Sequence, residues 1–176
     1  AEEYVGRVLQ QEPNDLDYVL FRARILAGKG DYIRAASLLD VYARQNTSSR
    51  AYLLLRARLQ YEWSKNFAAA SETIERALLL YPNDLDVLLF AARLASSTAA
   101  PLAGVTAEEF AKRALEIDPA NTEAKRYEID GMMRSGKWKG AYDSSKALIA
   151  SSGALRSDIF VHIRICLELG RNDEAW

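Results

Sequence analysis

The hydrophobic and polar residues of this chain repeat one pattern at nearly constant intervals. The stretch NDLDYVLFRAR begins at position 14, NDLDVLLFAAR begins at position 83, and a degraded copy, LLLRAR, begins at position 53. Equivalent residues in the three copies are 34 and then 35 positions apart. An Asn-Asp pair, which suits the start of a helix, opens two of the copies. The pattern therefore predicts one helix in each repeat, at the same place in a stack.

Alanines predict a second helix in each repeat. They recur at positions 1, 35, 70, 107, 141 and 175, in steps of 34, 35, 37, 34 and 34. An aromatic residue stands three positions before several of them (Tyr32, Phe67 and Trp138), and a Gly or polar turn comes before that. Small residues let two helix backbones approach closely, and the aromatic residues fill the space beside them. Each unit is therefore predicted to be a helix, a short turn and a second helix.

This period divides the chain into a single N-terminal helix, four full repeats and a partial fifth repeat. We expect a lone second helix over 1–12, four full repeats over 14–47, 48–82, 83–119 and 120–153, and a partial fifth repeat over 154–176. The third repeat is about three residues longer, which predicts an enlarged loop over 96–105, and Thr106 to Glu109 then predict a capping box.

The two ends of the chain look unlike natural termini. We expect a fragment of a longer protein, whose cut ends expose apolar surface and favour association end to end.

The pattern resembles the tetratricopeptide repeat family. The resemblance rests on the 34-residue period, on Gly30-Asp31-Tyr32 with Ala35 three residues later, and on ALEIDP at 114–119. It covers essentially the whole chain, although Ile129 and Ile163 stand where the family usually has Gly or Ala. The resemblance implies an all-α fold, an α-solenoid whose antiparallel helix pairs stack into a right-handed superhelix. It also implies that the first helix of each pair lines a concave groove.

Two rows of residues are expected to face that groove. One is an arginine ladder formed by Arg24, Arg58, Arg93 and Arg164, with Asp130 at the same position in the fourth repeat. The other lies four residues earlier and holds Leu20, Leu54, Leu89, Arg126 and Phe160. An arginine fork can donate two hydrogen bonds to one carboxylate, so the groove would suit a peptide with acidic residues next to apolar ones. Alternatively, the arginines pair with acids of neighbouring helices or are simply solvated.

Composition argues against other classes of partner. The 176 residues carry 23 Lys and Arg against 24 Asp and Glu, a formal net charge of −1, so no broad basic surface for nucleic acid is expected. No apolar run approaches the roughly 20 residues that span a bilayer, so no membrane insertion is expected.

Catalytic chemistry is not predicted. The single histidine, His162, and the single cysteine, Cys166, share a helical face, but two ligands are too few for a structural zinc site and we expect both to pack in the core. The Gly28 to Gly30 stretch lacks the spacing of a phosphate-binding loop. Met132 and Met133 are expected to fill the core, although methionines also suit an adaptable binding surface. We predict no enzyme, no cofactor and no metal.

The predicted function is a non-catalytic scaffold or adaptor that binds a peptide or protein segment in the concave groove. One alternative is a regulatory or assembly region of a larger enzyme or transcription regulator. An RNA-binding helical repeat is disfavoured by the near-neutral charge. Self-association through the ends of the array is a further alternative.

Overall fold

The computed structural model describes residues 16–42 and 48–174, so the helix expected over 1–12 lies outside the described residues. The chain forms two compact units, Ala1–Pro82 and Asn83–Trp176. Their boundary follows Pro82, which ends the second repeat in the sequence pattern. The described residues are helical apart from turns and one isolated bridge between Leu102 and Val105, so the all-α prediction is confirmed.

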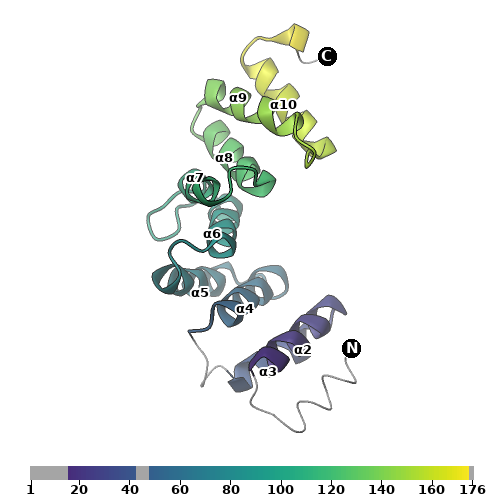
Figure 1. Cartoon of the computed structure of the whole chain (residues 1–176), viewed down its shortest axis with the longest axis vertical. Helices are drawn as coiled ribbons and strands as arrows, with labels where there is room; N and C mark the ends of the chain where they lie inside the picture. Colours follow the sequence, from purple (N-terminus) through teal and green to yellow (C-terminus); the bar gives the residue numbers. More distant parts are fainter. Residues whose placement is uncertain (1–15, 43–47, 175–176) are drawn as a thin grey trace. The chain divides into compact units, whose positions relative to one another are not determined.

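In the part of the first unit that the structure describes, the helices form two pairs. Helix α2 (Leu16–Gly28) packs against α3 (Tyr32–Tyr42), and α4 (Arg50–Glu62) packs against α5 (Phe67–Leu80). Helix α4 also contacts both α2 and α3, so the pairs are joined through the first helix of the second pair (Figure 1).

Over residues 83–174, its described part, the second unit forms five helices and a short final turn. Its helices are α6 (Leu85–Thr98), α7 (Ala107–Ile117), α8 (Thr122–Arg134), α9 (Trp138–Ile149) and α10 (Arg156–Glu168), followed by the 3₁₀ helix η1 (Asn172–Glu174). Each helix packs against the next, and α6 also packs against α8. The first helices of two successive pairs, α6 and α8, therefore lie side by side.

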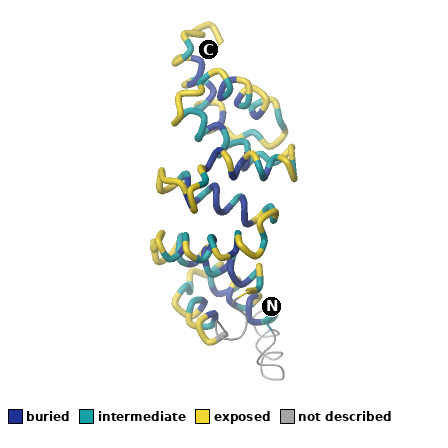
Figure 2. Tube along the Cα trace, turned by 90° about the vertical axis from the view of Figure 1, so that its left-hand side faces the viewer, coloured by how far each residue is buried: buried dark blue, intermediate teal, exposed yellow. Residues whose placement is uncertain are grey.

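Small residues at the predicted positions bring the helices together. Ala23, Ala57 and Ala92 of the first helices are fully buried, as are Ala35, Ala70 and Ala141 of the second helices. Figure 2 shows the consequence, because buried and exposed residues alternate along each helix and one side of it is covered. The predicted aromatic residues are less fully buried than the alanines: Phe67 is 40% exposed, and Tyr32 stacks on Trp63 with ring centroids 6.2 Å apart.

The loop of the third repeat is ordered by its own contacts. Helix α6 runs through Thr98, so the first three residues of the loop expected over 96–105 are helical instead. The backbone groups of Leu102 and Val105 exchange two hydrogen bonds of 2.9 Å, and the Leu102 side chain is buried. Thr106 and Glu109 then form the predicted capping box at the start of α7. We call residues 99–106 the α6–α7 loop.

None of the helices in the described part of the chain combines the length and the hydropathy that crossing a bilayer requires. The continuous array over 1–176 and the right-handed superhelix stay predictions.

Candidate functional site

The predicted groove residues of the second unit lie on its three first helices. Leu89 and Arg93 belong to α6, Arg126 and Asp130 to α8, and Phe160 and Arg164 to α10. Side-chain hydrogen bonds run between these helices, from Arg93 to Tyr127 and from Arg126 to Asp158. These six residues are expected to form one surface, which we call the groove face.

A hollow of about 170 Å³ opens between α8, α9 and α10. Its lining combines four apolar side chains with charged and polar ones: Ile129, Met133, Leu148 and Val161, with Arg126, Asp130, Ser145, Asp158 and Arg164. An apolar cavity of roughly 150 Å³ is large enough to hold benzene. This groove hollow can therefore receive one aromatic or branched aliphatic side chain.

Arg126 and Asp158 form the most tightly built ion pair of the groove hollow. The Arg126 Nε and Nη2 atoms donate hydrogen bonds to the two Asp158 carboxylate oxygens, both at 2.9 Å, and Nη2 also donates to the Gly153 carbonyl at 2.8 Å. The Asp158 carboxylate also accepts from the Leu155 N–H at 2.8 Å, at the start of α10. These hydrogen bonds, that from Arg126 above all, hold the pKa of Asp158 below its ordinary value, although the residue is buried. The pair is therefore fully charged and self-satisfied at neutral pH.

Arg164 is the cation that the groove hollow leaves available. Its side chain is exposed, and within the residues that the structure describes it makes no hydrogen bond or ion pair. Phe160 lies one helical turn earlier with 71% of its surface exposed. An apolar surface and an uncommitted guanidinium thus stand beside the hollow.

Arg93 is held by its own chain. Its Nη2 donates to Glu123 at 2.8 Å and its Nε to the Tyr127 hydroxyl at 3.1 Å. Burial would lower the pKa of Arg93, but these two hydrogen bonds raise it above its ordinary value. The guanidinium also lies 5.7 Å from the centroid of the Phe90 ring. Arg93 is therefore paired with an acid of the neighbouring helix α8, as the alternative interpretation of the ladder expects for this position.

Asp130 replaces arginine in the fourth repeat and joins two helices. Its Oδ2 atom accepts from Ser96 Oγ at 2.6 Å and from Arg134 Nε at 2.9 Å. The carboxylate therefore links α8 to α6 while it lines the groove hollow.

The first unit presents its four predicted residues differently. Leu20 is 3% exposed, so its side chain belongs to the core. Leu54 is half-buried and Arg24 is exposed. Arg58 is exposed and lies 3.7 Å from Glu62 one turn later, a surface ion pair of small energetic weight.

His162 and Cys166 pack in the core, as predicted. Ser145 Oγ lies 2.8 Å from His162 Nδ1 and donates to the Tyr142 carbonyl at 2.9 Å, while Cys166 Sγ lies 3.6 Å from Nε2. A neutral imidazole with its proton on Nδ1 satisfies all three contacts. The Ser145 hydroxyl donates its hydrogen bond to the Tyr142 carbonyl and not to His162. The imidazole therefore does not act as a base toward Ser145, and the arrangement is structural.

No group of three or more His, Cys, Asp or Glu residues in the described ranges is placed to hold a metal ion.

Several site residues escaped the sequence reasoning. Asp158, Glu123 and Tyr127 are the partners of the groove arginines, and only a three-dimensional register could have paired them. Met133 was assigned to the core, and it both packs there and lines the groove hollow. Glu108 was assigned to helix capping, but Glu109 alone makes the capping box, and Glu108 is buried against two lysines.

Comparison with solved structures agrees with the helix arrangement. YrrB, a TPR protein with an unusual peptide-binding site, superposes with a TM-score of 0.80 at 15% identity, covering 99% of this chain and 88% of YrrB. The chain has the tetratricopeptide repeat fold. The repeats also superpose on PilF of Pseudomonas aeruginosa with a TM-score of 0.82 at 14% identity, covering 97% of this chain and 76% of PilF. A tetratricopeptide repeat protein from Parabacteroides merdae gives 0.77 at 17% identity, covering 99% and 68%. No protein-family model matches the sequence, and no curated protein matches it.

Proposed function

We propose that this chain is a non-catalytic interaction scaffold that binds a segment of a partner protein on its groove face. The observation that carries the proposal is the groove hollow, a depression of about 170 Å³ that is lined in part by apolar side chains and has Arg164 among its lining residues. YrrB, which shares the fold, has a peptide-binding site. Repeat proteins present such surfaces on a constant frame, so the chemistry of the face selects the partner.

The chemistry of the groove hollow favours a peptide in which an apolar residue stands next to an acidic one. The apolar side chain would enter the hollow against Met133 and Val161, and the carboxylate would accept hydrogen bonds from Arg164. Arg126 does not compete for this carboxylate because its Nε and Nη2 atoms already donate hydrogen bonds to Asp158. Within the part of the chain that the structure describes, Arg164 has no hydrogen bond or ion pair, and it lines the hollow together with apolar side chains. These two features set the two parts of the preference.

Peptide display tests this proposal directly. Random dodecapeptides would be selected on the immobilised chain, and the enriched sequences would be measured by calorimetry against the wild type, Arg164→Glu and Arg156→Glu. Arg156 is a matched control because it is exposed on the same helix and does not line the groove hollow. We expect enrichment of acidic residues next to apolar ones, with affinity about tenfold or more weaker for Arg164→Glu only, because a charge is reversed at a contact.

Equal binding to all three proteins would refute the groove hollow as the binding site. Selection of basic peptides would refute the role given to Arg164.

A further inference from the structure

A second and larger hollow, of about 450 Å³, lies beside the α6–α7 loop in the second unit. Ala99, Ala100 and Pro101 of that loop form part of its lining. The third repeat is the one with extra residues in the sequence, so the insertion builds a wall that a repeat of ordinary length would lack. The rest of the lining comes from the end of α6, the start of α7, the end of α8 and Lys137. We call it the loop hollow.

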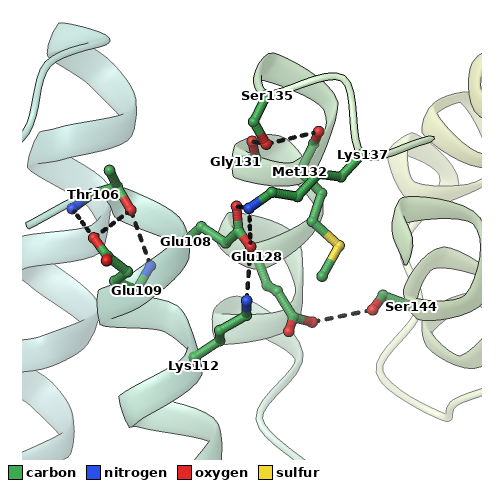
Figure 3. Close-up of polar contacts among 10 residues, drawn as sticks. All are labelled: Thr106, Glu108, Glu109, Lys112, Glu128, Gly131, Met132, Ser135, Lys137 and Ser144. Carbon is green, nitrogen blue, oxygen red and sulfur yellow. Dashed lines mark hydrogen bonds and ion pairs between the residues drawn. The ribbon is translucent and has the colours of Figure 1, made fainter. Parts of the chain in front are cut away.

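A buried carboxylate organises the polar side of the loop hollow (Figure 3). Glu108 is 6% exposed, and its Oε1 atom accepts from Lys112 Nζ at 2.8 Å. Lys137 Nζ donates to both carboxylate oxygens, at 3.0 and 2.9 Å. Helices α7 and α8 approach closely at this point: a Cβ atom added to Gly131 would lie only 2.7 Å from Glu108 Cβ. The carboxylate therefore fixes two lysines that come from different elements.

The fixed lysines keep hydrogen-bonding capacity. An ammonium group has three N–H donors, and Glu108 does not use all of them on either lysine. Both side chains are about half exposed, 49% for Lys112 and 56% for Lys137. Flexible lysines normally lose entropy when they bind an anion, and here part of that loss has already occurred on folding.

Charge in the loop hollow favours an anion. Burial would raise the pKa of Glu108, but hydrogen bonds from Lys112 and Lys137 lower it below its ordinary value, so the carboxylate is ionised at neutral pH. The ionisable lining is Glu108 and Glu109 with Lys112, Lys137 and Arg134, and Arg134 is paired with Asp130, which lies outside the lining. Glu109 keeps its charge, but its carboxylate is hydrogen-bonded to Thr106 in the capping box. Around Glu108 itself, two lysines face one carboxylate, so this cluster carries one positive charge in excess.

We propose that the loop hollow binds an acidic side chain of a partner protein. The partner's carboxylate accepts hydrogen bonds from Lys112, from Lys137 and from the Nη atoms of Arg134, whose Nε atom stays bonded to Asp130. The attached aliphatic carbons lie against the wall formed by Ala99, Ala100 and Pro101. A volume of about 450 Å³ with such an apolar wall suits a carboxylate on a short carbon chain better than a bare inorganic anion. This site is separate from the groove hollow and does not rest on the function proposed for it.

Three small probes and backbone amide NMR test the proposal on the whole chain. The probes are acetyl-Ala-Glu-Ala-amide, its Gln analogue and inorganic phosphate. We expect the Glu peptide to shift the amides of Gly131, Ser135 and Lys137 in a saturable way, and the other two probes to bind more weakly. Equal binding of the Gln analogue would show that charge is not recognised and would overturn the proposal. Equal or tighter binding of phosphate would assign the hollow to a free oxyanion and would overturn it too.

Matched variants localise the effect. Lys137→Gln should weaken binding of the Glu peptide about fivefold, the scale of one ion pair that is partly exposed. Arg134→Gln should weaken it as well without touching Glu108, so the test survives if loss of Lys137 disturbs the fold. Lys139→Gln and Arg164→Glu change exposed cations outside the loop hollow and should have no effect. Unchanged binding in both Lys137→Gln and Arg134→Gln, or no saturable shift in the wild type, would overturn the proposal.

Discussion

Replacing Arg126 by Met should destabilise the second unit strongly, because it isolates a buried charge. Met retains an unbranched apolar stem and removes the guanidinium, whose Nε and Nη2 atoms are both 2.9 Å from the Asp158 carboxylate. The Asp158 side chain is only 5% exposed, so water cannot replace the lost donors fully. The hydrogen bond from Arg126 to the Gly153 carbonyl is lost at the same time.

The magnitude follows from the exposure of the two partners. Breaking a fully buried ion pair by removing one partner costs about 3–5 kcal/mol. Arg126 is 28% exposed, and Asp158 keeps one hydrogen bond from the Leu155 N–H, so the penalty is smaller here. We expect a loss of roughly 2–3 kcal/mol in the free energy of unfolding of the second unit. In a cycle with Asp158→Asn, the coupling energy should be about 1–2 kcal/mol.

Hydrogen exchange read by mass spectrometry is the appropriate assay, because it reports local opening in α10 without assuming that the two units unfold together. The dependence on pH gives an internal check. The pKa of Asp158 is lowered in the folded chain, so the stabilisation from the pair is present above the unfolded value of about 3.9 and is lost as the pH falls through the folded value. In urea unfolding experiments, the difference between wild type and Arg126→Met should therefore shrink as the pH is lowered below about 3.9.

A coupling energy below about 0.5 kcal/mol would refute this reasoning, since the pair would then be no stronger than a surface contact. A difference between the two proteins that persists unchanged at low pH would also refute it.

Three other predictions concern the core of the second unit. Gly131→Ala should lower the free energy of unfolding by about 1–2 kcal/mol in urea titrations, because its Cβ would lie 2.7 Å from Glu108 Cβ, whereas Gly28→Ala meets no atom within 4 Å and should be neutral or slightly stabilising. Burial lowers the pKa of His162, so the unfolded chain binds the proton first; stability should fall as the pH drops below about 6.5, and less so in His162→Gln. Cys166 is fully buried and should react with a thiol reagent only at the rate of unfolding, so rapid labelling of the folded chain would contradict its position in the core.

Much of the fold could be predicted because the sequence repeats, so equivalent positions of successive repeats can be compared with one another. Alanine recurs at equivalent positions because two helices pack closely there, and Ala23, Ala57 and Ala92 are fully buried. Local chemistry was equally readable at Thr106, where the capping box needs only residues three positions apart. The end of α6 was misplaced because Ser96, Ser97 and Thr98 have low helix propensity but continue a helix that tertiary contacts support.

The groove residues were harder to interpret, because identical positions have different surroundings. Arg93 and Arg164 hold equivalent positions in the repeat. Arg93 donates hydrogen bonds to Glu123 and Tyr127, whereas Arg164 makes none within the described residues. Only the neighbouring repeat decides this, and its residues are about 30 positions away. The loop hollow could not be foreseen either, since Glu108 sits where helix capping already accounts for an acidic residue.

The side-chain hydrogen bonds between α6, α8 and α10 have a consequence for how this chain can evolve. Ser96 bonds Asp130, and Arg126 bonds Asp158, so each contact joins a residue to one in the following repeat. A donor and its acceptor must therefore change together, because substitution of only one of them leaves the other polar group without its hydrogen-bond partner. Duplication of one repeat would place a donor opposite the wrong partner. The second unit is thus an ordered series whose members are no longer interchangeable, although its backbone keeps the period of identical copies.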